Sequence, residues 1–340
     1  MNISQISSIR KTKNKARWLL LTLALSAIAL TVLSLCIGTA QVSLFDAVLA
    51  FFSGNTEDAS FKIIFQIRAP RALGAILAGS ALALSGVIIQ AVLGNPMASP
   101  NLIGVNAGAG FFAIIAMAIF PSLIGVIPLF AFLGALFASL LIYAISSVTG
   151  GGKTTVILVG VAIGSILTAG INAIKTLFPD SVYDVSGFLI GGLANINFKS
   201  VIFAAIFIIP ASIIAIFLSR RLDVLSLGDS VAGGLGISVK SSRLIFLSIA
   251  SLLAGSAISF VGLIGFVGLI VPHVMRLLVG GSHRYLISAS ILGGGVFLLA
   301  CDLISRTLFY PYELPVGILL SLIGGPFFII LILRGRRSDK

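Results

Sequence analysis

The stretch of sequence that decides the fold is RAPRALGAILAGSALALSGVIIQAVLGNPMASPNLIGVNAGAG, residues 68–110. It holds one apolar run, Ala72–Leu93, and the start of a second, Leu102–Phe120, separated by a turn that contains Asn and Pro. Each run has about 20 residues, the length at which an α-helix crosses the hydrocarbon core of a bilayer. Both are rich in Gly and Ala, which let membrane helices approach closely. The stretch therefore predicts two packed transmembrane helices.

The composition of the whole chain agrees with a lipid environment. The 340 residues are 58% hydrophobic and only 9% charged, with a mean hydropathy of +1.19, whereas a soluble domain carries roughly a quarter charged residues. A β-barrel would show shorter, alternating segments. The fold class expected is an all-α, polytopic membrane protein. The net charge of +12 gathers in short clusters between apolar runs, which excludes nucleic acid as the partner and indicates a lipid bilayer.

The remaining apolar runs set the number of crossings. They are Trp18–Gly38, Leu123–Val148, Thr155–Ile174, Val201–Leu218, Leu244–Phe266, Val267–Val279, Leu286–Cys301 and Leu314–Leu333. Val267–Val279 is short and contains Pro272, but counting it gives ten transmembrane helices with both termini cytoplasmic. That arrangement places 16 of the 22 Lys and Arg residues inside, whereas nine crossings would leave the basic C-terminal tail outside, against the positive-inside rule.

These crossings define one transmembrane domain over residues 1–340. Its cytoplasmic parts are an N-terminal tail (1–17), a loop (219–243) and a C-terminal tail (334–340). The first apolar run is longer than that of a usual signal peptide, so we expect a retained helix. In the outer loop 39–71, residues Ala40–Phe52 predict an interfacial helix.

Several motifs are more simply explained by structure than by chemistry. The segment TGGGKTT (149–155) has Ser147 where a phosphate-binding loop needs Gly, and it links two apolar runs, so we expect a cytoplasmic turn. The pairs Gly104/Gly108 and Gly160/Gly164 predict close helix packing. His273 and His283 have no further ligand at metal-binding spacing, and neither a metal site nor a cofactor is expected.

Four charged residues near the outer boundary need a partner. Asp302 lies four residues before Arg306, on the same helical face, and a local ion pair is favoured over a proton relay. Arg68, Arg71 and Arg306 break the positive-inside pattern. Their guanidinium groups suit either lipid headgroups, reached by snorkelling, or carboxylates of a partner protein.

Three blocks of sequence resemble the ABC importer permease family for ferric siderophores, haem and vitamin B12, the FecCD type. They are residues 68–110, FVGLIVPHVMRLLVGGSHRYLI (266–287), and CDLISR with ELPVGILLSLIGGPFF (301–306 and 313–328). The first block has the family's R-x-P-R start and its N-P-(L/M)-A-x-P turn. The resemblance implies a bundle like that of the vitamin B12 importer permease. Its implied partners are a second permease copy or close paralogue, two cytoplasmic ATPase subunits and an extracytoplasmic substrate-binding protein.

The resemblance also implies roles for particular residues. The arginines Arg68, Arg71 and Arg306 match positions that dock acidic residues of the binding protein. The loop LGDSVAGGLGISVKSSR (227–243) resembles the ATPase-coupling pattern L-G-x-x-x-A-x-x-L-G, through Leu227, Gly228, Ala232, Leu235 and Gly236. A cytoplasmic gate is implied at Asn95, Met97, Thr154 and Thr155.

The sequence therefore predicts the non-enzymatic permease subunit of a binding-protein-dependent ABC importer in the cytoplasmic (inner) membrane of a bacterium. It would translocate ferric siderophore by alternating access, while a separate subunit hydrolyses ATP. Cobalamin and haem are the alternative cargoes. A distant alternative is an ion-coupled secondary transporter, which requires several intramembrane carboxylates, and only Asp302 is a candidate.

Overall fold

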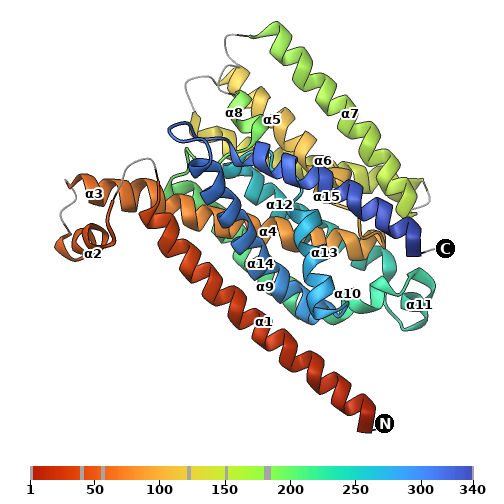
Figure 1. Ribbon diagram of the computed structural model, residues 1–340. Helices are drawn as coiled ribbons and strands as arrows, with labels where there is room; N and C mark the ends of the chain where they lie inside the picture. The colour runs from red at the N-terminus through yellow and green to blue at the C-terminus, as the bar shows by residue number, and fades with distance from the viewer. Residues whose placement is uncertain are drawn as a thin grey trace.

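The computed structural model describes residues 3–38, 42–54, 58–120, 124–149, 152–179 and 185–338, and in these ranges it is built of helices without a strand (Figure 1). The all-α class is confirmed. Within the described ranges, seven helical segments are long and apolar enough to cross a membrane, and three apolar helical stretches are shorter. The main helices are α1 (Ile3–Cys36), α4 (Ala69–Leu93), α5 (Val105–Ile119), α6 (Ile127–Val148), α7 (Lys153–Leu177), α9 (Phe198–Phe217), α12 (Val239–Val261), α13 (Val267–Val279), α14 (His283–Thr307) and α15 (Val316–Ser338).

Short elements join these helices. They are α2 (Leu44–Ser53), α3 (Ala59–Phe61), the π-helical turn Lys62–Arg68, the 3₁₀ turns Pro100–Ile103 and Ile124–Val126, α8 (Val185–Ile190), α10 (Ser219–Ser226) and α11 (Asp229–Gly234). Each of the ten predicted apolar runs coincides with one main helix. The count of ten crossings remains a prediction, because α5, α13 and the apolar stretch of α15 (Val316–Leu331) are shorter than a usual span.

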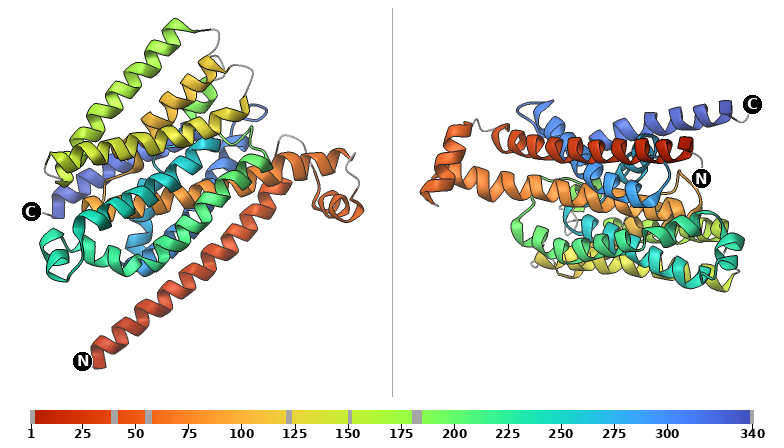
Figure 2. Two further views of the ribbon diagram at one scale, coloured as in Figure 1. Left: turned by 180° about the vertical axis from the view of Figure 1, so that it is seen from behind. Right: turned by 90° about the horizontal axis from the view of Figure 1, so that it is seen from below.

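The helices share a common long direction, which gives the molecule two ends. The N- and C-terminal segments, α10 and α11 lie toward one end, here called the α11 end, and α2 and α3 lie at the opposite, α2 end (Figures 1 and 2). This arrangement agrees with the prediction that both tails and the loop 219–243 share one side of the membrane. Residues 1–2 and 339–340 of the tails lie outside the described residues.

The centre of the bundle consists of α4 and α12, whose most apolar windows are 78% and 72% buried, against 6% in α1 and 17% in α7. Glycines allow the closest approaches. A Cβ on Gly79 of α4 would collide with the carbonyl oxygen of Gly294 on α14, and a Cβ on Gly86 would collide with that of Gly268 on α13. Since backbones pack against each other at these two points, α4, α13 and α14 form one tightly fitted unit.

The predicted small-residue pairs pack within the chain at three of their four positions. A Cβ on Gly108 would collide with the backbone of Gly134 on α6, and one on Gly160 with the carbonyl oxygen of Leu102. Gly104 faces the side chain of Ile142, whereas Gly164 has open space around it. The pair on α7 therefore packs through one glycine only.

The prediction that a single run extends from Leu244 to Phe266 is wrong at its end. α12 stops at Val261, and the chain turns through residues 262–266 with Gly262 and Phe266 at φ +74° and +66°. Apolar residues continue through this turn, so hydropathy alone does not mark it. The next helix, α13, has 13 residues and a length of about 20 Å, which is less than the roughly 30 Å hydrocarbon core.

Backbone hydrogen bonds hold this turn and the end of α12 against α8 and the two glycines that follow α8. The Leu263 N–H donates to Phe188 O at 2.9 Å, and the Gly192 N–H donates to Val261 O at 2.8 Å. The Gly317 N–H donates to Gly191 O at 3.1 Å, next to the start of α15. Irregular backbone at membrane depth is tolerated only where such bonds satisfy it.

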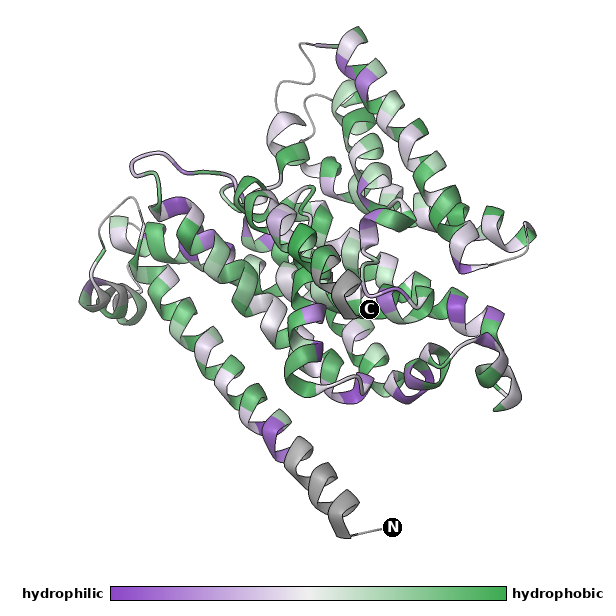
Figure 3. Ribbon diagram, turned by 45° about the vertical axis from the view of Figure 1, so that its right-hand side comes forward, coloured by the Kyte–Doolittle hydropathy of each residue, from purple (hydrophilic) through white to green (hydrophobic). Residues whose placement is uncertain are grey.

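The outer faces of the peripheral helices are apolar, as a lipid environment requires. Figure 3 shows hydrophobic residues along most of the helix lengths. Exposed examples are Leu21, Leu25 and Ile28 on α1, and Ile202, Ile206 and Ile209 on α9. Such extended apolar surface would be unstable in water and is stable against acyl chains.

The predicted interfacial helix begins and ends slightly later than Ala40–Phe52. α2 runs from Leu44 to Ser53, and the Ser43 Oγ caps it by accepting from the Asp46 N–H at 3.0 Å. Phe45 and Phe52 are largely exposed. Residues 39–41 lie outside the described residues, and the placement of α2 in the interface remains a prediction.

Candidate functional site

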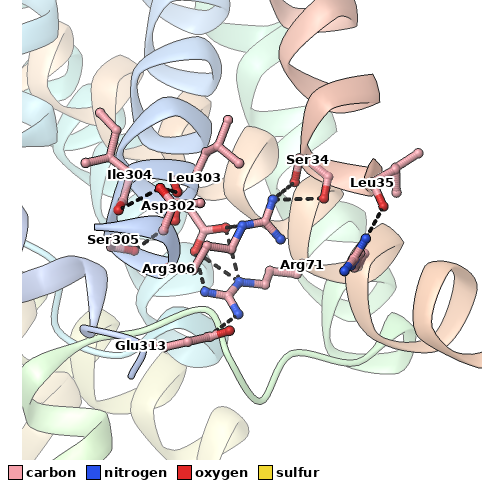
Figure 4. A network of polar contacts seen from close by, with 11 residues as sticks. Ser34, Leu35, Arg71, Asp302, Leu303, Ile304, Ser305, Arg306 and Glu313 are labelled. Atoms are coloured by element: carbon pink, nitrogen blue, oxygen red, sulfur yellow. Dashed lines mark hydrogen bonds and ion pairs between the residues drawn. The ribbon is translucent and has the colours of Figure 1, made fainter. Parts of the chain in front are cut away.

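At the α2 end, Arg71 of α4 lies between two carboxylates that come from a distant part of the sequence (Figure 4). Its Nε donates to both oxygens of Asp302 at 3.1 Å, and its Nη2 donates to Asp302 Oδ1 at 3.0 Å. Its Nη1 donates to Glu313 Oε2 at 2.7 Å. Arg71 is 6% exposed and Asp302 is fully buried. A fork-like contact of this kind fixes both the distance and the orientation of α4 and α14.

The other two predicted docking arginines bind the C-terminal end of α1. Arg306 Nη2 donates to the carbonyl oxygen and the Oγ of Ser34, at 2.8 and 2.7 Å. Arg68 Nη1 donates to the carbonyl oxygens of Leu35 and Cys36, at 2.6 and 2.9 Å. The last carbonyls of a helix lack partners within the helix and carry partial negative charge, so cations stabilise them.

The structure thus brings the three predicted arginines to one place but buries them. Each is less than 10% exposed and makes bonds within the chain. Their docking role remains a prediction, and the structure adds a bracing role for α1, α4 and α14. The expected local pair of Asp302 with Arg306 exists at 4.0 Å, but Arg71 is the closer partner.

The sequence interpretation missed Glu313 and Ser34. The signal for Glu313 was present: between residues 230 and 338, Asp302 and Glu313 are the only acids, and both follow the apolar run that ends at Cys301. No comparable signal marks Ser34, because serines are common in this chain and a helix terminus accepts through its backbone.

A cavity of about 650 Å³ opens beside this network. Arg71 and Glu313 line one part of it, and Asn195, Ser259, Phe120 and Pro315 contribute polar and apolar surface elsewhere. The cavity reaches Gly262, in the turn after α12. Its volume lies within the range of small-molecule sites, roughly 300–1,000 Å³.

At the α11 end, the predicted coupling residues form a projecting segment. α11 is preceded by Gly228 at φ +108° and followed by Gly236 at φ +79°, conformations that L side chains rarely adopt. Leu227 and Leu235 are 64% and 62% exposed, whereas Ala232 is buried against the bundle. Val231, missed in the sequence, is also exposed and lies between the two leucines at four-residue spacing. These three exposed apolar side chains, here called the ridge, are suited to contact with a partner protein.

An ion pair holds this projecting segment to the bundle. Arg243 Nη2, at the start of α12, donates to both oxygens of Asp229 at 2.9 Å. Since Asp229 is the first residue of α11, the carboxylate also lies at the positive end of that short helix. The pair ties the orientation of α11 to α12.

The predicted gate residues lie on two neighbouring turns. Asn95 Oδ1 accepts from the Met97 N–H at 2.9 Å, which shapes the turn after α4. Thr154 and Thr155 lie in the first turn of α7. The turns are adjacent, since a Cβ on Gly94 would lie 2.6 Å from Lys153 Nζ. The structure therefore brings both pairs together at the α11 end, and their gating role remains a prediction.

The segment 149–155 connects α6 to α7, with Lys153 as the first residue of α7. A phosphate-binding loop requires a preceding strand, and this segment follows a helix. Gly150 and Gly151 lie outside the described residues. In the part of the chain that the structure describes, no three His, Cys, Asp or Glu side chains gather as a metal site would need.

The chain is similar to known proteins over most of its length. The model of the FecCD transport family matches residues 24–334. The hemin transport system permease protein HmuU of Yersinia pestis is 36% identical, over 84% of this chain and 87% of the relative. The Fe(3+)-citrate import system permease protein YfmE of Bacillus subtilis is 38% identical, over 95% and 97%. A solved metal-chelate type ABC transporter in an inward-facing conformation shares 30% identity with a TM-score of 0.82, covering 93% of this chain and 98% of its own.

The buried carboxylate provides a test of the arginine network. Asp302→Leu should lower the free energy of unfolding by about 3–5 kcal/mol, because Arg71 and Arg306 would then face each other without their shared counter-charge. Thermal unfolding of the detergent-purified protein measures the change. The double variant Asp302→Leu/Arg71→Leu should recover part of the loss. Glu313→Gln, at the partly exposed edge, is the control, and equal stability of Asp302→Leu and this control would contradict the prediction.

Proposed function

This chain belongs to the FecCD transport family, and we propose that it is the permease through which an ABC importer moves a ferric chelate across the cytoplasmic membrane of a bacterium. The observation that carries the proposal is the extent of the family match. It runs from residue 24 to residue 334, through the described helices from α1 to α15. As an ABC permease, the protein works in a membrane complex, and ATP hydrolysis belongs to a separate subunit.

The cargo is inferred from the names of the relatives. One is named for hemin, one for Fe(3+)-citrate, and the solved neighbour is of the metal-chelate type. Chelated iron is common to the first two, so a ferric siderophore or related chelate is the proposed cargo, with haem and cobalamin as alternatives. The cavity beside Arg71 and Glu313 opens at the end expected to face outward and would receive cargo released by the binding protein.

A second permease copy or a close paralogue is proposed to cover α7. This helix is long enough to cross the membrane but only 17% buried in its apolar window. Ser165, Thr168 and Asn172 are exposed along one of its faces. Polar side chains at membrane depth normally face other helices or a water-filled path and not lipid. A second copy packed along α7 would enclose them and create the path for the cargo between the two permeases.

Alternating access supplies the mechanism. ATP binding and hydrolysis in two ATPase subunits at the α11 end would switch the bundle between outward and inward states. The turns that carry Asn95 and Thr155 would form the inner gate. The ion-coupled alternative loses support from the geometry, because Asp302 is held by two arginines and is not open to a transported proton.

The direction of insertion follows the distribution of charge. The α11 end carries the basic loop 219–243 and the ends of both tails, and cytoplasmic segments carry an excess of Lys and Arg. The α11 end is therefore proposed to be cytoplasmic and the α2 end extracytoplasmic. The projecting ridge would then face the ATPase, and the arginine network would face the binding protein.

The cargo assignment is tested by uptake. Radioactive iron supplied as several ferric siderophores should enter a wild-type strain and fail, for one chelate class, to enter a strain deleted for this gene. A plasmid copy of the gene should restore that uptake. If a strain lacking redundant importers shows no iron deficit, and labelled haem and cobalamin also enter normally, the proposed function is wrong.

The ridge on the projecting segment predicts where the ATPase binds. Leu227→Glu combined with Leu235→Glu should reduce ATPase co-purification by about tenfold or more, since a buried Leu contributes about 1.5–3 kcal/mol. Leu308→Glu, equally exposed but at the α2 end, is the matched control and should leave co-purification unchanged. Equal ATPase recovery from both variants would place the contact elsewhere.

The arginine network predicts how the binding protein docks. Asp302 is fully buried, whereas the Glu313 side chain is 31% exposed, so an incoming carboxylate would replace Glu313 on Arg71. Glu313→Gln should then lower the dissociation constant of the binding protein by up to about fivefold, the equivalent of about 1 kcal/mol for a partly exposed ion pair. Binding to permease in nanodiscs measures this, with Arg284→Gln at the opposite end as control. Weaker binding to Glu313→Gln would contradict a competition for Arg71.

A further inference from the structure

α10 contacts the first residue of α14 through a single carboxylate. Asp223 Oδ1 accepts from the backbone N–H of His283 at 2.8 Å. The same oxygen lies 2.7 Å from His283 Nδ1, and because an ionised carboxylate only accepts, the ring nitrogen is the donor. His283 is 5% exposed. One oxygen on α10 thus holds both the backbone and the side chain at the start of α14.

This contact replaces the cap that α14 lacks. Ser282 stands at the N-cap position, but its side chain makes no capping hydrogen bond. The first N–H groups of a helix have no partner within it, and an anion at that terminus is favoured by the helix dipole. Asp223 supplies both the acceptor and the negative charge from another helix, so the position of α10 determines where α14 begins.

The body of α10 packs into the bundle at the same point. Leu222 and Leu225, on either side of Asp223 in the sequence, are fully or almost fully buried, and α10 contacts both α14 and α4. The exposed ridge at Leu227 follows within two residues of Leu225. A force on the ridge therefore reaches Asp223 through less than two helical turns.

From His283, α14 extends about 37 Å to the opposite end of the molecule. There it carries Asp302 and Arg306, which bind α4 and α1. Between the two ends, the backbones of α14 and α4 touch at Gly294 and Gly79. A packed helix held in this way transmits a displacement of one end to the other.

We propose that Asp223 is a positioning residue that transmits movement of the α10–α11 segment to α14 and, through α14, to the arginine network at the α2 end. The inference rests on the proposed function, in which the ATPase binds the ridge. The second tie of the segment, Asp229 to Arg243, leads to α12. The Asp223–His283 contact thus leads to α14, and the Asp229–Arg243 ion pair leads to α12. Of these two helices, only α14 carries residues of the network that holds Arg71.

The experiment uses the complete complex, with ATPase and binding protein, reconstituted in liposomes. The measured quantity is the ratio of ATP hydrolysis with cargo-loaded binding protein to hydrolysis without it. Asp223→Ala should lower this ratio by about fivefold or more, the lower range of typical coupling between sites, while the ATPase still co-purifies. Asp223→Asn should retain most of the ratio, because its amide oxygen accepts the same two bonds.

Two further variants refine the result. His283→Ala removes the ring bond but keeps the backbone bond, and it should give an intermediate ratio. Ser226→Ala removes an exposed hydroxyl on α10 that donates to the backbone carbonyl of Asp223 and not to its carboxylate, so it is the matched control and should behave as wild type. A purely local structural role would lower complex yield in Asp223→Ala and leave the ratio of the surviving complex unchanged.

The outcomes separate this inference from the function on which it rests. A wild-type complex without any response to loaded binding protein would overturn the proposed function. A responsive wild type with an unchanged ratio in Asp223→Ala would overturn the inference alone. If the complex with Asp223→Ala does not assemble, the hydrolysis ratio of His283→Ala becomes the deciding measurement. A wild-type ratio in His283→Ala would overturn the inference.

Discussion

The carboxylate of Asp302 is buried near one end of a helix bundle, and its need for a positive partner organises that end of the molecule. Lipid offers no solvation to a buried charge, so the group must be paired within the protein. Arg71 supplies the pairing from α4, which fixes α4 against α14. Arg306 lies on the other side of the same carboxylate and extends to the last turn of α1. Three helices are thus positioned by one acid.

At the opposite end of the molecule, the first residue of the same helix, α14, is bound by a second acid, Asp223. Asp223 caps the first turn of α14, and Asp302 forms the ion pair with Arg71 near its C-terminal end. Between these two charged contacts, α14 packs against the backbone of α4. For a transport subunit that must connect events on two sides of a membrane, such a helix would link the proposed ATPase side with the proposed outer side.

Much of this fold could be predicted from the sequence, because lipid selects helices by length and apolarity. The run Ala72–Leu93 coincides with α4 to within a few residues. The turn at 262–266 escaped prediction because Leu263, Ile264 and Phe266 continue the apolar run while the backbone reverses. The partners of the arginines escaped for another reason. Arg71 and Glu313 are 242 residues apart, and no local spacing encodes such a contact.

The shortness of α13 affects how the membrane voltage is distributed across the protein. α13 covers about 20 of roughly 30 Å, so a crossing made by α13 would place the turn that precedes it within the depth of the bilayer. The cavity reaches that turn at Gly262, and in the proposed orientation it opens toward the outer face. Water in such a cavity would concentrate the electric field over the remaining thickness, and the proposed charged cargo would cross most of the potential in a short step near the proposed inner gate.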